Sequence, residues 1–337
     1  PVEFLPQIAQ HPLEVELGRW VIDTALTQIA AWQDAGVDLP VSVNISGFHL
    51  QQAGFLDELR ALLAAHPNVP RGYLELEVLE SSALEDIALV SAVIDASATL
   101  GVSTGYSSLT YLKRLPAQVL KIDQSFVRDM LQDSDDLAIL EGILGLATAF
   151  RRRAIAEGVE TVAHGETLLR LGCDLGQGYG IARPMAAADL PAWRQRWRPD
   201  PRWAHAHCLD RELMPVLIAG VEHRGWIVAL GEHLDGRRDA PPPLDHHQCR
   251  FGQWLDKTIH QPRHAATFAT IETLHLRVHA LAADLLKRRS QGHDVEALAG
   301  MAELHALWDA LLVHLEYLLK DDPRSLAPSS GGGSNCR

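Results

Sequence analysis

Apolar and polar positions follow two different patterns along the chain. Up to about residue 195, apolar runs of four or five residues alternate with stretches of helical periodicity. Short, continuously apolar runs separated by helices are typical of a parallel sheet with covered faces. The apolar runs are Val41–Ile45, Leu74–Val78, Val119–Ile122 and Arg153–Ala156, and the clearest helical patterns are Leu13–Gly36 and Gly54–His66. This part of the sequence therefore predicts an α/β fold.

The pattern changes in the last third of the chain, where only helical periods remain. The segment Trp193–Trp203 contains two prolines and indicates a linker. Amphipathic helices joined by short connections then predict a four-helix bundle. The helical patterns are Arg211–Leu234, Gln248–Ile259, Ala265–Arg289 and Val295–Lys320. We therefore expect a barrel-like domain over 1–195, a linker over 196–207, a bundle over 208–321 and a disordered tail over 322–337.

Composition narrows the classes of protein. A formal net charge of −13 disfavours binding to a nucleic-acid polymer. No window approaches the roughly 20 apolar residues of a membrane span. Four cysteines in 337 residues do not form a disulfide framework, which favours a reducing, cytoplasmic location. The chain starts at Pro1 without a methionine, so we interpret it as a piece of a longer protein.

Polar side chains lie within or at the end of nearly every predicted strand. They are Asn44, Glu77, Lys121, Glu157 and Gln177. Strand ends are often polar because they are solvated, which is the simple alternative for any one of these residues. As a group, however, amide and carboxylate oxygens are the ligands of Mg²⁺, and a lysine suits a phosphate or an attacking water. Together they indicate metal-assisted hydrolysis of a phosphate ester.

Seven short motifs occur in order across the same region. They are Val43-Asn-Ile-Ser46, Leu76-Glu-Val-Leu-Glu80, Thr104-Gly-Tyr-Ser-Ser-Leu109, Leu115-Pro116, Leu120-Lys-Ile-Asp123, Ala156-Glu-Gly-Val-Glu160 and Gln177-Gly-Tyr179. Residues 1–195 thereby resemble the EAL family of cyclic-di-GMP phosphodiesterases. The resemblance implies a TIM-like barrel that uses two Mg²⁺ or Mn²⁺ ions to cleave cyclic di-GMP to the linear dinucleotide.

The resemblance also assigns roles to individual residues. Asn44, Glu77 and Glu157 match metal ligands, and Lys121 matches the lysine that contacts the catalytic water. Lys121, Glu157 and Gln177 would form the catalytic group. Supporting roles fall to Glu80, Asp123 and Glu160.

Two motifs of the family are missing from the chain. The Glu-Ala-Leu motif would lie upstream of Pro1, and an Asp-Asp-Phe-Gly segment would lie between Ser103 and Thr104. Both normally supply metal-binding carboxylates. We therefore expect an incomplete barrel with unpaired strand edges. The abrupt junction after Ser103 favours the omission of a segment over gradual loss.

The helical region contains a second group of chemically notable residues. His275 and His279 are spaced i, i+4 and lie on one helix face. Cys249 and His223 lie on two other predicted helices, and three imidazoles with one thiolate can form a tetrahedral Zn²⁺ site. A chain with 17 histidines will also contain some such pairs by chance. Cys208 beside His205 and His207 is a weaker alternative metal cluster.

The wider pattern resembles the chemoreceptor zinc-binding (CZB) domain. It consists of His223-x-x-Trp226, Cys249-x-Phe-Gly-x-Trp-Leu255 and Leu274-His-x-x-Val-His279. The resemblance implies Zn²⁺ ligands at His223, Cys249, His275 and His279, with signalling through zinc occupancy or thiolate oxidation. His233, His246 and His247 are competitors for the place of His223.

The sequence thus predicts a cyclic-di-GMP phosphodiesterase under the control of a zinc- or redox-sensing bundle. The alternative is a catalytically inactive barrel that binds cyclic di-GMP or serves as a scaffold beside a zinc sensor. Both families are compatible with a homodimer.

Overall fold

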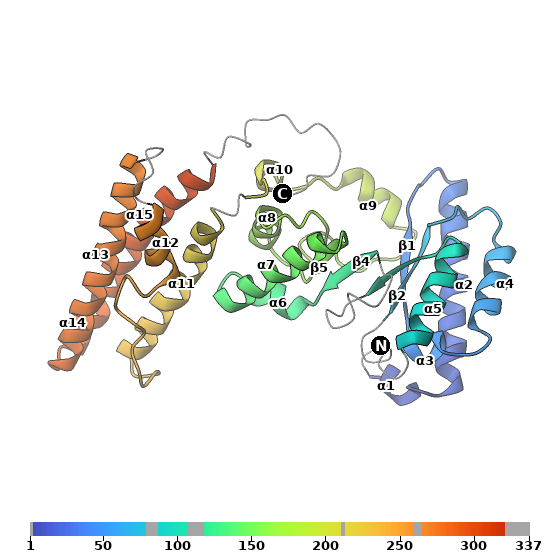
Figure 1. Cartoon of the computed structure of the whole chain (residues 1–337), viewed down its shortest axis with the longest axis horizontal. Coiled ribbons are helices and arrows are strands. Elements are labelled where there is room, and N and C mark those ends of the chain that lie inside the picture. Colours follow the sequence, from blue (N-terminus) through green and yellow to red (C-terminus); the bar gives the residue numbers. More distant parts are fainter. Residues whose placement is uncertain (1–2, 79–86, 107–117, 210–212, 259–264, 321–337) are drawn as a thin grey trace. The chain divides into compact units, whose positions relative to one another are not determined.

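A computed structural model describes residues 3–78, 87–106, 118–209, 213–258 and 265–320 (Figure 1). The predicted tail at 322–337, the supporting residue Glu80 and the motif residues 107–109 lie outside the described residues. The chain divides into two compact units, which we describe separately. One contains residues 1–124, 142–160 and 173–199, and the other contains residues 125–141, 161–172 and 200–337.

Six parallel strands form one sheet whose spatial order follows the chain order. They are β1 (Val41–Ile45), β2 (Leu74–Val78), β3 (Ser103–Tyr106), β4 (Val119–Ile122), β5 (Arg153–Glu157) and β6 (Gly176–Gln177). Helices connect successive strands. They are α3 (Gly47–Leu50), α4 (Phe55–Ala65), α5 (Ile87–Thr99), α6 (Gln124–Asp129), α7 (Ser134–Ala149) and α8 (Val162–Arg170). The alternation of strands and helices predicted from the sequence is confirmed.

One face of the sheet is covered by helices. The helix α2 (Pro12–Asp34), which follows the short α1 (Leu5–Ile8), packs against β1, while α5 packs against β3 and α4 packs against α2 and α5 (Figure 1). Alternate strand residues point into the core, because side chains along a strand alternate between faces. The buried cluster includes Ile22, Leu26, Val43, Ile45, Phe55, Leu59, Leu74, Leu76, Val78, Val90 and Ile94. The opposite face therefore receives the polar residues of the same strands.

The expected gap in the middle of the sheet does not occur. Ser103–Tyr106 forms β3, which pairs with β2 on one side and with β4 on the other. The expectation of unpaired edges at this point was wrong, because the residues after the junction occupy the strand position themselves. Thr104 is buried on the covered face of this strand.

The last part of the chain is a helical bundle, as predicted. Its helices are α11 (Met214–Leu234), α12 (Arg250–Thr258), α13 (Ala265–Ser290), α14 (Asp294–Ala299) and α15 (Met301–Lys320). The sequence predicts one helix over 295–320, but the structure separates α14 from α15 at Gly300. Gly300 is the C-cap of α14, and a Cβ atom there would lie 2.3 Å from Leu285 Cδ2 of α13, so the chain passes close to α13 at this point. The bundle core contains Ile227, Leu230, Phe251, Ile271, Val278, Leu285, Leu304, Trp308, Leu311 and Leu315.

The segment expected to be a linker contains ordered structure. It follows α9 (Leu190–Arg196) and includes α10 (Pro201–His205), whose N-cap Asp200 accepts a hydrogen bond from the Arg202 backbone. The Trp203 indole Nε1 donates a hydrogen bond to the Val162 carbonyl at 2.8 Å. This contact fixes α10 against α8. Among the described helices, none has both the length and the apolar character that crossing a membrane would require.

Candidate metal centres in the barrel and the bundle

The polar face of the sheet follows from strand alternation. Val43 and Ile45 of β1 are buried, whereas Asn44 between them is exposed. Asn44 lies directly opposite Glu77 of β2 in the strand register. Residues paired in this way in a parallel sheet have side chains on the same face, so Asn44 and Glu77 share the polar face.

A lysine lies between two carboxylates at the C-terminal ends of the strands. Lys121 of β4 donates a hydrogen bond from Nζ to Glu77 Oε2 at 2.7 Å and forms an ion pair with Glu157 Oε1 of β5. Burial lowers the pKa of Lys121, but the hydrogen bonds to Glu157 and Glu77 outweigh it and raise the pKa above its ordinary value. The lysine is therefore a fixed positive charge at the centre of the polar face.

The other residues predicted for this site lie around the cluster. Gln177 of β6 is paired in register with Glu157 of β5, at the edge of the sheet. Asp123 directly follows β4, and Glu160 follows β5. The structure thus brings Glu77, Lys121 and Glu157 into direct contact and places the rest at neighbouring strand ends.

The loop after β5 packs against Gly178, the glycine of the Gln177-Gly-Tyr179 motif. A Cβ atom at Gly178 would lie 2.4 Å from the backbone nitrogen of Val159, so only glycine allows the two backbones to meet. The Gly180 amide then donates a hydrogen bond to the Val159 carbonyl at 2.8 Å. The Gln-Gly-Tyr-Gly spacing was the available signal. This packing fixes Glu157 and Gln177 relative to each other.

The donors on this face suit one hard divalent cation better than two. Mg²⁺ is usually held by one or two carboxylates together with phosphate oxygens of the substrate. Glu77 and Glu157 could provide the carboxylates, and Asn44 could add an amide oxygen. A pair of ions ~3.5–4 Å apart needs more neutralising carboxylates. β3 supplies none here, because Gly105 is the residue in register with Glu77. The described residues Glu77, Glu157 and Asn44 by themselves therefore do not match a two-ion centre.

The second site is built in the bundle by residues from three helices. His223 lies on α11, Cys249 directly precedes α12, and His275 and His279 are one turn apart on α13. One ligand atom from each of the four residues lies within 4.8 Å of all the others. The three imidazoles are only 1–5% exposed in an apolar core. No other group of three or more potential ligands meets this condition in the described part of the chain, Cys208 with its neighbouring histidines included.

The spacing of the ligand atoms is close to that of a tetrahedral zinc site. His275 Nε2 lies 3.1 Å from His223 Nε2 and 3.5 Å from Cys249 Sγ, and His223 Nε2 lies 4.0 Å from Cys249 Sγ. Tetrahedral Zn²⁺ with ordinary bond lengths separates two nitrogens by ~3.3 Å and a nitrogen from a sulfur by ~3.6 Å. The ligand atoms of His223, Cys249 and His275 are therefore within a few tenths of an ångström of tetrahedral spacing, and the group of four, whose ligand atoms all lie within 4.8 Å of one another, would close further around an ion.

Backbone carbonyls set the orientation of two of the imidazoles. His223 Nδ1 donates to the Ala219 carbonyl at 3.0 Å, and His279 Nδ1 donates to the Leu244 carbonyl at 2.8 Å. Since a carbonyl only accepts, each ring has its proton on Nδ1 and a lone pair on Nε2. His279 Nε2 is buried without a hydrogen-bond partner. This is the second-sphere arrangement of a metal-binding histidine, and it leaves a lone pair for an ion.

The electrostatics of the pocket favour neutral imidazoles. Burial, together with the smaller effect of the neighbouring His279, lowers the pKa of His223 to about 4. Burial also lowers the pKa values of His275 and His279. Neutral imidazoles are the form that binds Zn²⁺. The four residues therefore fit zinc in chemistry as well as in spacing.

Cys249 occupies the N-cap position of α12. Its Sγ accepts a hydrogen bond from the Gly252 amide at 3.1 Å. Burial raises the pKa of this thiol, whereas a bound Zn²⁺ would displace the proton. Aromatic rings complete the wall of the pocket. The Trp308 ring is stacked on that of His223 with 5.2 Å between the ring centroids, and Phe251 is edge-on to His275 with 5.1 Å between the centroids. Trp308 belongs to no distinctive motif, so its place in the pocket could not be predicted from the sequence.

The alternative histidines take other positions. His233 Nδ1 donates to the Arg238 carbonyl at 2.9 Å. His246 and His247 lie beside the pocket and are not part of the four-residue group. Of the candidates, the structure thus places His223 in the ligand group.

Comparison with known proteins assigns both regions. The family model of the EAL domain matches residues 1–184, and that of the chemoreceptor zinc-binding domain matches residues 223–286. The chain is 42% identical over 200 residues to the bifunctional diguanylate cyclase/cyclic di-GMP phosphodiesterase MucR of Pseudomonas aeruginosa, covering 57% of this chain and 29% of that protein. It is 34% identical over 204 residues to the cyclic di-GMP phosphodiesterase PdeR of Escherichia coli, covering 58% of this chain and 31% of that protein.

Solved structures agree on the fold of the first region. The PaMucR phosphodiesterase in complex with c-di-GMP matches with a TM-score of 0.53 and 40% identity, over 56% of this chain and 80% of that one. The EAL domain of Mycobacterium smegmatis DcpA matches with a TM-score of 0.52 and 32% identity, over 55% and 86%. The predicted TIM-like barrel is thereby confirmed. The chain spans about a third of the length of the curated relatives it matches.

Proposed function

Because the chain belongs to the EAL domain family and also carries a chemoreceptor zinc-binding domain, we propose that it is a cyclic-di-GMP phosphodiesterase controlled by zinc. The observation that carries the proposal is the Lys121 ammonium held between the carboxylates of Glu77 and Glu157. These groups combine a positive charge for phosphate with oxygen donors for a cation, at the strand ends where barrel enzymes place their active sites. The relatives named as phosphodiesterases support this assignment.

In this proposal each group has a separate task. Glu77, Glu157 and Asn44 would hold one Mg²⁺ or Mn²⁺ ion together with phosphate oxygens of the dinucleotide. The ion would polarise the phosphoryl group when bound. Lys121 would orient a water molecule toward the phosphorus with the N–H that its two carboxylates leave free, and Gln177 would support Glu157 from the next strand.

The zinc-binding part of the proposal rests on the four-residue group of the bundle. His223, Cys249, His275 and His279 would hold about one Zn²⁺ per chain with a complete tetrahedral shell. Four protein ligands leave no open position for a substrate, which is typical of structural or sensory sites rather than of catalytic ones. We therefore assign zinc a regulatory role, through its occupancy or through oxidation of the Cys249 thiolate.

A second function is favoured by the same cluster in the barrel. Lys121 already neutralises part of the charge of Glu77 and Glu157, and the described donors do not match two ions. Cyclic di-GMP could then bind to the polar face without being cleaved. In this alternative the barrel is a binding or scaffold module beside the zinc sensor.

One experiment separates the two functions. Purified chain is incubated with cyclic di-GMP and Mn²⁺, and both bound nucleotide and linear product are measured. Formation of product that Glu157→Gln abolishes supports the phosphodiesterase. Binding without product supports the alternative, and neither binding nor product refutes both. Glu75→Gln is the matched control, because Glu75 lies on the polar face of β2, accepts a hydrogen bond from Ser42 at 2.6 Å and is not one of the two carboxylates paired with Lys121.

Control by zinc is tested in the same assay. The Cys249→Ala/His279→Ala double variant removes two of the four ligands without touching the barrel. We expect product formation, or nucleotide binding in the alternative, to become independent of added zinc or chelator. Equal responses of the double variant and the unchanged chain to zinc would refute regulation through this site.

A further inference from the structure

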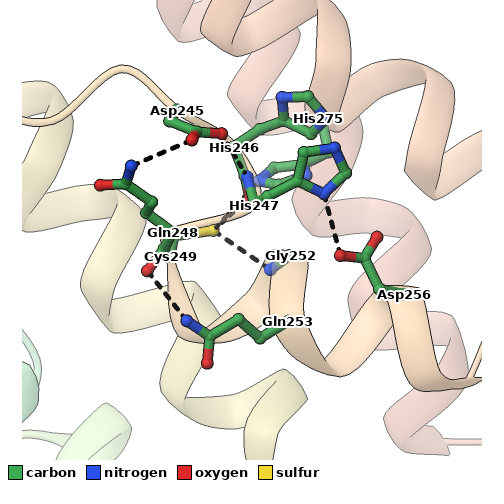
Figure 2. Close-up of polar contacts among 9 residues, drawn as sticks. All are labelled: Asp245, His246, His247, Gln248, Cys249, Gly252, Gln253, Asp256 and His275. Atoms are coloured by element: carbon green, nitrogen blue, oxygen red, sulfur yellow. Dashed lines mark hydrogen bonds and ion pairs between the residues drawn. The ribbon is translucent and has the colours of Figure 1, made fainter.

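The segment before Cys249 is a fixed turn that carries two further histidines. The Asp245 carboxylate accepts hydrogen bonds from the His247 amide and from the Gln248 side chain, both at 3.0 Å (Figure 2). Gln253 of α12 donates to the Gln248 carbonyl at 3.3 Å. The turn therefore holds His246 and His247 at the edge of the zinc pocket.

The outer histidine of this turn is paired with a carboxylate. His247 Nδ1 lies 2.9 Å from Asp256 Oδ2 of α12, and both side chains are more than half exposed, at 59% and 52% (Figure 2). A carboxylate that holds Nδ1–H directs the lone pair of Nε2 outward, as it does for histidines that bind metals. His247 is thus an accessible imidazole oriented to take an ion from solvent.

The inner histidine lies between this exposed ring and the buried ligands. The ring of His246 is 3.9 Å from that of His247, centroid to centroid. On its other side it is 6.0 Å from His275 and 6.2 Å from His279. The imidazoles therefore form a continuous row from the surface to the buried ligand group, and each member is within reach of the next.

We propose that His246 and His247 form a transfer site that captures Zn²⁺ from solvent and passes it to the four buried ligands. This inference depends on the zinc binding put forward under Proposed function. The buried ligands are enclosed by an apolar core, so a hydrated ion needs ligands that replace its water stepwise on the way in. On capture, zinc–nitrogen bonds to His247 and His246 form as zinc–water bonds break. On transfer, zinc bonds to the buried ligands form as the bonds to His246 and His247 and the remaining zinc–water bonds break, and the Cys249 thiol releases its proton to water as the zinc–sulfur bond forms.

A transfer site has a kinetic signature that an equilibrium ligand lacks. Residues along a route lower the barrier in both directions, so their loss slows uptake and release by the same factor and leaves the dissociation constant unchanged. Loss of a true ligand instead weakens the binding itself. The ratio of the two rates therefore distinguishes the roles.

The experiment measures zinc exchange on the whole chain. Uptake by the metal-free chain and release to a chromogenic chelator are followed by stopped flow, for the unchanged chain and for His246→Ala/His247→Ala. We expect both rates to fall roughly tenfold, by analogy with the effect of second-sphere substitutions at metal sites. Asp256→Asn is expected to slow both rates in the same direction. Zinc stoichiometry and affinity should stay the same in all variants.

The matched control is His293→Ala. His293 is also exposed and bound to a carboxylate, with Nδ1 2.6 Å from Glu296 Oε2, but its chain neighbours are Gly292 and Asp294 rather than a second imidazole. The His293→Ala variant should take up and release zinc at the rates of the unchanged chain. Equal rates in the double variant would overturn the transfer site, and so would a lower affinity or stoichiometry. Absence of zinc from the unchanged chain would refute the zinc site itself.

Discussion

Gly252 is the residue at which the zinc pocket has least room for change. It lies in the first turn of α12, next to the turn that positions Cys249. A Cβ atom at this position would lie 1.8 Å from the His246 carbonyl oxygen and 3.4 Å from Cys249 Sγ. The distance to the carbonyl oxygen is shorter than the ordinary contact distance of ~3.5 Å by roughly 1.5 Å or more. Because the obstructing atom belongs to the backbone, no side-chain rotation relieves the clash.

The change in the free energy of unfolding caused by Gly252→Ala is the sum of two opposing effects. Alanine in place of glycine in a helix stabilises by ~0.5–1 kcal/mol. Overpacking of a close contact costs ~1–3 kcal/mol and displaces the backbone. We therefore expect a net loss of ~1–2 kcal/mol in the free energy of unfolding. The displaced turn carries Cys249, so zinc affinity should fall by roughly tenfold to a hundredfold.

Two measurements check this prediction. Competition with a chelator gives the zinc affinity, and urea unfolding gives the stability. Gly220→Ala on α11 is the control, since its Cβ would meet only Leu312 Cδ2 at an ordinary 3.8 Å. That variant should keep its zinc affinity and gain ~0.4–1 kcal/mol of stability. If Gly252→Ala bound zinc as tightly as the unchanged chain, the described packing of the pocket would be wrong.

Three further predictions follow from the two domains. Elemental analysis should find about one equivalent of zinc in the unchanged chain and no stoichiometric zinc in the Cys249→Ala/His279→Ala double variant. Full retention of zinc by the double variant would contradict the ligand assignment. Removal of zinc by a chelator should lower the melting temperature of the unchanged chain but not of this variant, because the binding energy contributes to folding. Burial lowers the pKa of His49 in the barrel, although Glu58 and Glu14 raise it. The unfolded chain then binds a proton more readily, so stability is full above pH ~6.5 and falls as the pH drops toward the folded-state pKa. The urea midpoint of the unchanged chain should be lower at the more acidic of two pH values. If His49→Gln kept the same pH dependence, the assignment of this loss of stability to His49 would be refuted.

The arrangement of the barrel could be predicted largely from periodicity. Strand alternation places Asn44 and Glu77 on one face whatever the details of packing, and parallel strands bring their ends together. The direct bond of Lys121 to both carboxylates was not predictable, because residues 77, 121 and 157 are far apart in the sequence and only the register of β2, β4 and β5 sets their spacing. The formation of β3 was also missed, since pairing with two neighbouring strands overrides the loss of the usual strand residues.

The zinc pocket shows the same division between side chains and backbone. Distinctive residue types at characteristic spacings pointed to the four ligands, which the structure brings together. The carbonyls of Ala219 and Leu244, which orient His223 and His279, leave no trace in the sequence because every residue has a carbonyl. The role of His246 likewise depends on a turn whose shape is set by Asp245 and by the absence of a side chain at Gly252.

The most direct test of the account is the fate of cyclic di-GMP on the barrel. The purified chain is incubated with the dinucleotide and Mn²⁺, and the linear product is separated and quantified for the unchanged chain, Glu157→Gln and Glu75→Gln. The account predicts product from the unchanged chain and from Glu75→Gln, and none from Glu157→Gln. Product formed equally by all three would contradict the role of the Glu77–Lys121–Glu157 cluster.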